Sequence, residues 1–109
     1  MGITKSELFN AKKNTLAAMF KVLGHPARLS ILQYIINKKE CICSDLVDEL
    51  GLAQATISQH LKELKNIGLI QGTIEGKSVC YCINTEVWNT FYEEFKIFFE
   101  QQVELKTCC

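Results

Sequence analysis

Six cysteines are the residues of this 109-residue chain best suited to chemistry. The amino-terminal stretch MGITKSELFNAKK lacks a basic region followed by an apolar core, so we expect no export and reduced thiols rather than a disulfide framework. Thiolates are soft ligands, and Cys41 and Cys43, two residues apart at the start of a predicted helix, can converge on one thiophilic ion. This pair is the centre of a predicted metal site.

Two other pairs of cysteines are candidates for a further ligand of the ion at Cys41 and Cys43. We favour Cys108 and Cys109, because the carboxyl terminus can fold back within one subunit or reach a second copy of the chain. Cys80 and Cys82 alternate onto one face of a predicted strand and are the other candidates. The simpler alternatives are small hydrophobic residues in an ordinary strand for Cys80 and Cys82, and a disordered tail for Cys108 and Cys109.

The spacing of apolar residues predicts the helices that position these thiols. Thr4 and Glu7 form a capping box for a first helix that runs to about residue 22, and Gly24 ends it. Pro26 suits the first turn of a second helix that ends near residue 37. The predicted apolar face of this second helix consists of Leu29, Leu32 and Ile36.

Two further helices, joined by a glycine turn, predict a helix-turn-helix in residues 44–67. Ser44 caps a short helix that ends at Gly51, and a longer helix runs from Gln54 to about Asn66. The residues predicted to face inward are Leu46, Val47 and Leu50 in the first of these helices, and Ile57, Leu61 and Leu64 in the second.

Residues 69–83 predict a two-stranded hairpin, the only β structure expected. Two β-prone runs flank Glu75-Gly76-Lys77, and Val79, Tyr81 and Ile83 should face the core. Thr85 then caps a long last helix, predicted over residues 85–106. Its aromatic residues lie mostly on one side and offer more apolar surface than a small monomer leaves in water: Trp88, Phe91, Phe95, Phe98 and Phe99.

A helix-turn-helix followed by a hairpin is the layout of a winged DNA-binding domain, whose second helix enters the major groove. Glutamine can pair with adenine, Thr and Ser reach bases or phosphates, and lysines neutralise phosphate. His60 is either a phosphate contact or a hydrogen-bonded core residue. The simpler alternative to DNA binding is that the polar face of this helix is only solvated. The predicted DNA-binding residues are Gln54, Thr56, Ser58, Gln59, His60, Lys62, Lys65 and, at the tip of the wing, Lys77.

Composition limits the class of protein. The formal net charge is zero, but residues 1–39 carry seven Lys or Arg against Glu7 alone, which a net value hides. No stretch reaches the roughly 18 apolar residues of a membrane span, so we expect a cytoplasmic protein of one domain, residues 1–109. No C-x-x-C beside a βαβ pattern and no Cys-His-Asp set is identifiable, so we expect no enzyme.

Three motifs in order resemble those of the ArsR/SmtB repressors. Residues 23–32 (LGHPARLSIL) resemble the LG-x-P-x-R-x-x-I-L element, residues 56–64 (TISQHLKEL) resemble the S-x-H-L-x-x-L recognition helix, and Gly76-Lys77 falls where the family's wing turns. The resemblance spans about residues 8–100. It implies a mainly α winged helix-turn-helix of about five helices and a hairpin wing, in a homodimer formed through residues 1–22 and 85–106.

Residues 40–46 (ECICSDL) resemble the family's E-L-C-V-C-D-L box, where arsenic or soft-metal binding sets DNA affinity. Arsenic-sensing relatives carry a third thiol one turn later, but Leu46 and Val47 occupy those positions here. Cadmium and lead sensors add cysteines from the amino-terminal arm, and this chain has none before Cys41. Zinc sensors use imidazole and carboxylate in the last helix, which contains no histidine.

We therefore expect a repressor of double-stranded operator DNA, released when arsenite or antimonite binds cysteine thiolates. A redox sensor that responds to thiol oxidation is one alternative, and a cadmium- or lead-responsive repressor is another. A thiol-based metal-buffering protein is the alternative outside the regulators, indicated by the adjacent Cys108 and Cys109.

Overall fold

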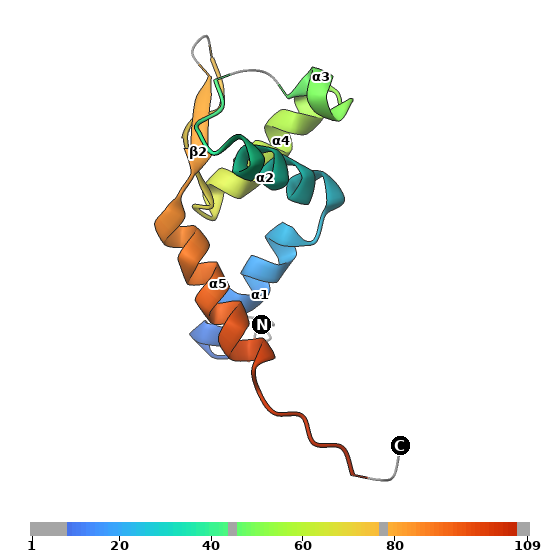
Figure 1. Cartoon of the computed structure of the whole chain (residues 1–109), viewed down its shortest axis with the longest axis vertical. Helices are drawn as coiled ribbons and strands as arrows, with labels where there is room; N and C mark the ends of the chain where they lie inside the picture. The colour runs from blue at the N-terminus through green and yellow to red at the C-terminus, as the bar shows by residue number, and fades with distance from the viewer. Residues whose placement is uncertain (1–8, 44–45, 77–78, 107–109) are drawn as a thin grey trace, which may run out of the picture.

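The computed structural model describes residues 9–43, 46–76 and 79–106. In these residues the chain forms five helices and two strands (Figure 1), which confirms the predicted mainly α winged helix-turn-helix. In chain order the elements are α1 (Ala11–Leu23), α2 (Pro26–Lys38), α3 (Val47–Leu50), α4 (Gln54–Asn66), β1 (Ile70–Thr73), β2 (Cys80–Ile83) and α5 (Thr85–Phe99).

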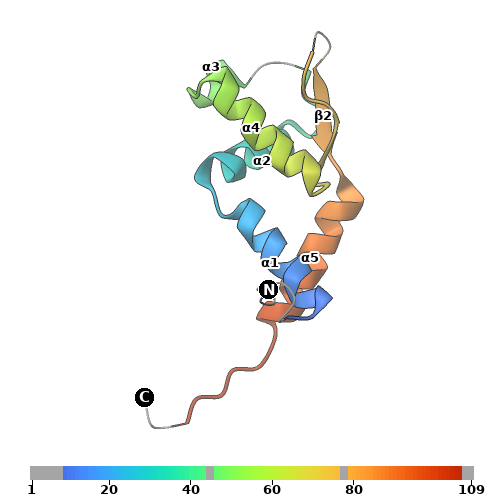
Figure 2. The same cartoon turned by 180° about the vertical axis from the view of Figure 1, so that it is seen from behind.

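Two groups of elements lie at opposite ends of the long axis. Helices α1 and α5 pack at one end, and α3, α4 and the hairpin form the other, with α2 between them (Figures 1 and 2). Helix α4 crosses α2, so the second helix of the helix-turn-helix rests on a helix outside it. No helix of the described residues is long and apolar enough to cross a membrane.

Helix α1 differs from the sequence prediction at its start. Its cap is Asn10, whose side chain accepts a hydrogen bond of 2.8 Å from the Lys13 amide, so the helix begins at Ala11 rather than near Thr4. Thr4 and Glu7 lie outside the described residues. A side-chain oxygen at the N-cap satisfies an amide that has no partner within the helix, which is why Asn10 sets the boundary.

Helix α2 has the predicted bounds to within one residue, but a different buried face. Ile31, Leu32 and Ile35 are buried, whereas Leu29 and Ile36 are 52% and 38% exposed. Apolar positions on both sides of this helix follow a helical period, and only packing against α4 and β2 decides which set is covered. The predicted face is therefore correct only at Leu32.

The close pairing of the two hairpin strands requires a glycine at position 72. Gly72 of β1 has φ +117° and stands opposite Tyr81, where a Cβ atom would collide with the Cys80 carbonyl oxygen and the Tyr81 Cα. Close approach of two backbones at a positive φ requires glycine. The strands pair antiparallel from Ile70 opposite Ile83 to Thr73 opposite Cys80.

A short bridge adds to the β structure that the sequence predicts. Ile42, in the connection between α2 and α3, pairs antiparallel with Tyr81. The Ile42 amide donates to the Tyr81 carbonyl at 2.8 Å, and the Tyr81 amide donates to the Ile42 carbonyl at 2.9 Å. Strand β2 therefore has a partner on each side, β1 on one and Ile42 on the other.

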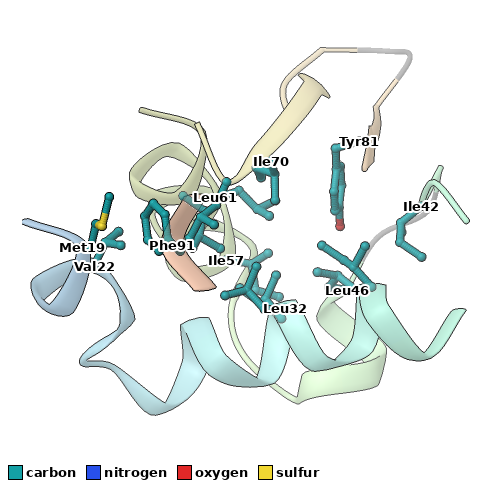
Figure 3. Close-up of a cluster of buried hydrophobic side chains, with 14 residues drawn as sticks. Met19, Val22, Leu32, Ile42, Leu46, Ile57, Leu61, Ile70, Tyr81 and Phe91 are labelled. Carbon is teal, nitrogen blue, oxygen red and sulfur yellow. The ribbon is translucent and has the colours of Figure 1, made fainter. Parts of the chain in front are cut away.

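One hydrophobic core joins every element (Figure 3). Tyr81 is 1% exposed and lies among Ile42, Leu46 and Ile70, so the wing is packed into the domain. Leu46 was predicted to face inward and is buried, as are Ile57, Leu61 and Leu64 of α4. Toward the other end of the domain the core continues through Met19, Val22 and Phe91.

Helix α5 is shorter than predicted. Asn84, not Thr85, is its cap and accepts a hydrogen bond of 3.3 Å from the Val87 amide, and the helix ends at Phe99 rather than near residue 106. Residues 102–106 have no regular structure. Of the aromatic residues, Phe91 is buried, Trp88 and Phe95 are half-buried, and Phe98 and Phe99 are exposed.

Candidate nucleic-acid interface and thiol cluster

Helix α4 separates a buried face from an exposed polar face. Gln54, Thr56 and Gln59 are exposed, as the predicted recognition helix requires, and Ser58 is half-buried. The Gln54 amide donates to the Ser58 hydroxyl at 3.3 Å, and the Gln59 amide donates to a Glu63 carboxylate oxygen at 3.2 Å. These bonds run along the helix surface, so exchanging them for bonds to base edges requires only rotation of side chains.

Two lysines connect α4 to the wing. Lys65 Nζ donates to the Gly72 carbonyl at 2.6 Å, and Lys62 Nζ forms an exposed ion pair of 2.9 Å with Glu75. A hollow of about 630 Å³ between helix and hairpin is lined by the two lysines, Glu75, Asn66, Thr73 and Ile74. Lys77 lies outside the described residues. The helix and the wing therefore present their polar groups around one concave surface.

His60 lies on the buried side of α4 and is 7% exposed. Arg28 Nε donates to His60 Nδ1 at 3.1 Å, and the His25 ring lies 4.4 Å away between centroids. His25 itself caps α2, because its Nδ1 accepts from the Ala27 amide at 3.1 Å. Of the two interpretations of His60, this geometry favours the hydrogen-bonded core histidine over the phosphate contact.

Burial holds the pKa of His60 below its ordinary value of 6.5, and the neighbouring His25 and Arg28 lower it further, against an opposing effect of Glu63. The cationic ring would lose the Arg28 bond, because Nδ1 would then carry a proton. Neutral His60 thus joins α4 to Arg28, whose guanidinium also donates to the Val22 carbonyl at 3.3 Å.

Four cysteines meet across the Ile42–Tyr81 bridge. Cys41 forms a disulfide with Cys82, and Cys43 forms one with Cys80. The expectation of thiols without a disulfide framework is therefore wrong for this structure. The physical reason is the register: the bridge places each residue of Cys41-Ile42-Cys43 opposite one residue of Cys80-Tyr81-Cys82.

The backbone accounts for the close approach within each cysteine pair. The Cα atoms are 4.3 Å apart for Cys41 and Cys82, and 4.1 Å apart for Cys43 and Cys80. Residues that flank a hydrogen-bonded antiparallel pair face each other at about 4.5 Å between Cα atoms, which is the closest pairing that a sheet provides.

The sequence placed Cys80 and Cys82 on one face of a strand as the less favoured candidates for a further ligand, but it did not predict that they lie opposite Cys43 and Cys41, respectively. The available signal was the repeated C-x-C spacing, because two extended segments with that spacing can oppose all four side chains. The predicted ligands Cys108 and Cys109 lie outside the described residues, and their role stays a prediction. With the sulfurs bonded in pairs, the described residues hold no group of three His, Cys, Asp or Glu that could bind a metal ion.

Comparison with known proteins gives one family and several relatives. Residues 25–71 match the family described as bacterial regulatory protein, arsR family. The chain is 32% identical over 101 residues to the cadmium resistance transcriptional regulatory protein CadC of Listeria innocua. The aligned segment covers 91% of this chain and 82% of the relative.

Two further relatives are HTH-type transcriptional regulators. One, from Methanocaldococcus jannaschii, is 37% identical over 82 residues, covering 74% of this chain and 80% of the relative. NmtR of Mycobacterium tuberculosis is 32% identical over 68 residues, covering 62% of this chain and 56% of the relative. The matched family segment contains α2, α3 and α4, and α4 is the helix whose exposed polar face is described above.

The pKa of His60 predicts a loss of stability in mild acid. The unfolded chain binds a proton at His60 near pH 6.5, whereas the folded chain binds it only at lower pH. The free energy of unfolding is therefore largest above pH 6.5 and decreases as the pH falls toward the lower pKa of the folded state. Urea unfolding at pH 7.5 and 5.5 measures this fall. In His60→Asn, whose amide oxygen accepts from Arg28 without titrating, the fall should be smaller. Equal falls in both proteins would contradict this role.

Proposed function

The chain belongs to the ArsR family of bacterial regulatory proteins, and we propose that it is a repressor released from its operator when a thiophilic metal or metalloid ion binds its cysteines. The observation that carries the proposal is the position of Cys41 and Cys43. They lie in the connection that leads into the helix-turn-helix and is hydrogen-bonded to the wing at Ile42. An ion held there acts on both elements that face DNA.

DNA recognition is assigned to the outer face of α4. Gln54, Thr56 and Gln59 are exposed and can turn to base edges. Half-buried Ser58 is assigned to a base or a phosphate, and Lys62 and Lys65, which line the hollow between α4 and the wing, are assigned to phosphates. Lys77, predicted at the tip of the wing, is assigned to the DNA backbone or minor groove. His60 contributes by positioning α4 through Arg28 rather than by touching phosphate.

A second copy of the chain is the partner that best fits the α1 and α5 end. Phe20 of α1 stacks on Phe95 of α5 with ring centroids 4.5 Å apart, yet Ile97, Phe98 and Phe99 remain 54%, 44% and 69% exposed. Next to them, α1 and α5 line a hollow of about 540 Å³. Apolar surface of this kind favours association, and two copies present two α4 helices to the half-sites of a twofold operator.

Arsenite or antimonite is the preferred inducer. Pyramidal arsenic(III) is satisfied by three thiolates and needs no imidazole. Both histidines of the chain are already engaged, His25 as the cap of α2 and His60 with Arg28. The name of the CadC relative indicates cadmium resistance, which supports a thiophilic ion without selecting arsenic.

The mechanism is linkage between two binding equilibria. If the ion binds the free protein more tightly than the operator-bound protein, it must weaken operator binding by the same factor. The paired sulfurs favour one second candidate, a redox sensor. In that case a peroxide accepts two electrons from two thiols, the thiols lose two protons and form a disulfide, and the peroxide leaves as water.

The role of α4 predicts a specific loss in Gln59→Ala. Loss of a bidentate base contact costs about 1–3 kcal/mol against the correct base. Affinity for the protein's own promoter should fall accordingly while affinity for scrambled DNA at the same salt changes little, as measured by fluorescence anisotropy. Gln33→Ala is the matched control, because Gln33 is exposed on α2 and bonds Asn37 at the same helical spacing. Equal losses in both variants would contradict the assignment.

The second-copy proposal predicts that Phe98→Glu produces monomers. A charge on the exposed aromatic face opposes its burial, so sedimentation should show half the wild-type mass and promoter affinity should drop. Leu29→Glu is the control, since it puts the same charge on an apolar residue of α2 that is 52% exposed. A wild-type chain that sediments as a monomer would refute the proposal directly.

The sensing proposal predicts release by arsenite from the reduced protein bound to its labelled promoter. Arsenite should lower the anisotropy, zinc should not, and Cys41→Ser/Cys43→Ser should stay bound because two of the thiolates are gone. Cadmium is titrated beside them, and release by cadmium alone would assign the inducer to that ion. Release by peroxide that survives chelation and reverses with dithiothreitol, without an arsenite response, would establish the redox candidate instead.

A further inference from the structure

The four cysteines of the bridge share one face of a small antiparallel sheet. Side chains alternate along a strand, so the neighbours of Ile42 and of Tyr81 point away from the core that these two residues enter. Cys41, Cys43 and Cys80 are accordingly exposed, and Cys82 is half-buried. Small hydrophobic residues that serve only packing would lie on the other face, so these sulfurs are placed for chemistry.

The spacing of the four sulfurs suits one small ion. Each cross-strand pair has its Cα atoms little more than 4 Å apart, at 4.3 and 4.1 Å. Along each strand the two cysteines are two residues apart, which separates them by about 7 Å, and rotation of the side chains can shorten this distance. Once the two disulfides are reduced, rotation of the side chains is what would bring three of these thiols to one centre on the Cys-bearing face of the Ile42–Tyr81 bridge.

We propose that Cys80 and Cys82 complete, within one subunit, the ion site that Cys41 and Cys43 begin. This inference rests on the proposed function and names the missing ligands of that site. The competing source is the carboxyl-terminal tail, and the segment that follows α5, drawn in red, extends away from β2 (Figure 1). The wing thiols are already opposite Cys41 and Cys43, so binding requires no rearrangement of the backbone.

The chemistry balances in two steps. A dithiol reductant supplies two electrons and two protons to each disulfide, which becomes two thiols while the reductant becomes a disulfide. Arsenous acid then exchanges its three hydroxyl groups for three of the four thiols: three S–H and three As–O bonds break, three As–S bonds form, and three water molecules leave. Arsenic stays in the +3 state, and the fourth thiol is spare.

An apolar hollow beside the cluster suits an uncharged ligand. Cys41 and Cys82 form part of the lining of a space of about 390 Å³, whose surface is mostly apolar and includes Ile35, Ile83 and Trp88, with Lys39 and Glu40 also in the lining. Arsenous acid is neutral at physiological pH, whereas a divalent cation would have to be desolvated at such a wall. The apolar part of this wall thus accommodates the uncharged metalloid.

Closure of this site affects DNA binding through the wing. An ion shared by residues 41–43 and β2 fixes the wing to the connection that leads into α3, in addition to the two backbone hydrogen bonds. Lys65 then transmits the position of the wing to α4 through the Gly72 carbonyl. The ion-bound protein holds one arrangement of helix and wing, and an operator that requires another arrangement is released.

The test compares two double variants of the reduced full-length chain, Cys80→Ser/Cys82→Ser and Cys108→Ser/Cys109→Ser. Arsenite is titrated while near-ultraviolet absorption of arsenic–thiolate bonds and promoter release are recorded in parallel. The wing variant should need at least about 100-fold more arsenite for both signals, since loss even of outer-shell groups costs 10–100-fold. The tail variant should respond like wild type, and Cys80→Ser alone, with three thiols left, should shift far less than the double variant.

A second measurement needs no substitution. Arsenite should protect Cys80 and Cys82 of the wild-type chain from alkylation, as read by mass spectrometry, together with one arsenic bound per subunit. A wing variant that responds like wild type, or protection of Cys108 and Cys109 in place of the wing thiols, would overturn the inference. A chain that binds no arsenite overturns this inference and the choice of arsenite as inducer, whereas binding through the wing thiols without DNA release overturns only the proposed function.

Discussion

Two backbone hydrogen bonds between Ile42 and Tyr81 are the constraint on which the rest of the structure depends. They place the connection between α2 and α3 beside the wing and set the register that opposes Cys41 to Cys82 and Cys43 to Cys80. Buried backbone groups need partners, and this exchange supplies two of them for a segment that belongs to no regular element. Tyr81, packed at 1% exposure, keeps the bridge in place.

Helix α4 is held by contacts on two sides, and this makes it a rigid platform. Its apolar face enters the core, while His60 reaches Arg28 and Lys65 reaches the wing carbonyl of Gly72. On its exposed face, Gln54 bonds Ser58 and Gln59 bonds Glu63, each one turn away, and such surface bonds can be exchanged for others. A recognition surface needs this combination, because specificity requires fixed positions for side chains that can exchange hydrogen bonds.

The proposed sensing and association surfaces lie at different ends of the molecule (Figure 2). The thiol cluster adjoins the wing, whereas the exposed aromatic residues gather where α1 and α5 meet. Helix α2 and the shared core lie between them, so a change at the thiols reaches DNA through the wing and α4 without passing through the association surface. In the proposed mechanism, ion binding therefore acts on the wing and α4 rather than on the association surface.

Local chemistry in the sequence determined where α2 and α4 run, that a hairpin follows, and which face of α4 is buried, because capping, proline placement and helical period act between residues a few positions apart. Tertiary structure alone decided that α2 buries Ile31 and Ile35, that His60 bonds Arg28, and that Cys80 and Cys82 oppose Cys41 and Cys43. The side-chain bonds among these outcomes join residues that are 32, 37 and 41 positions apart in the chain. No pattern within one segment contains that information, because the register between distant segments is set only when the core closes around Tyr81.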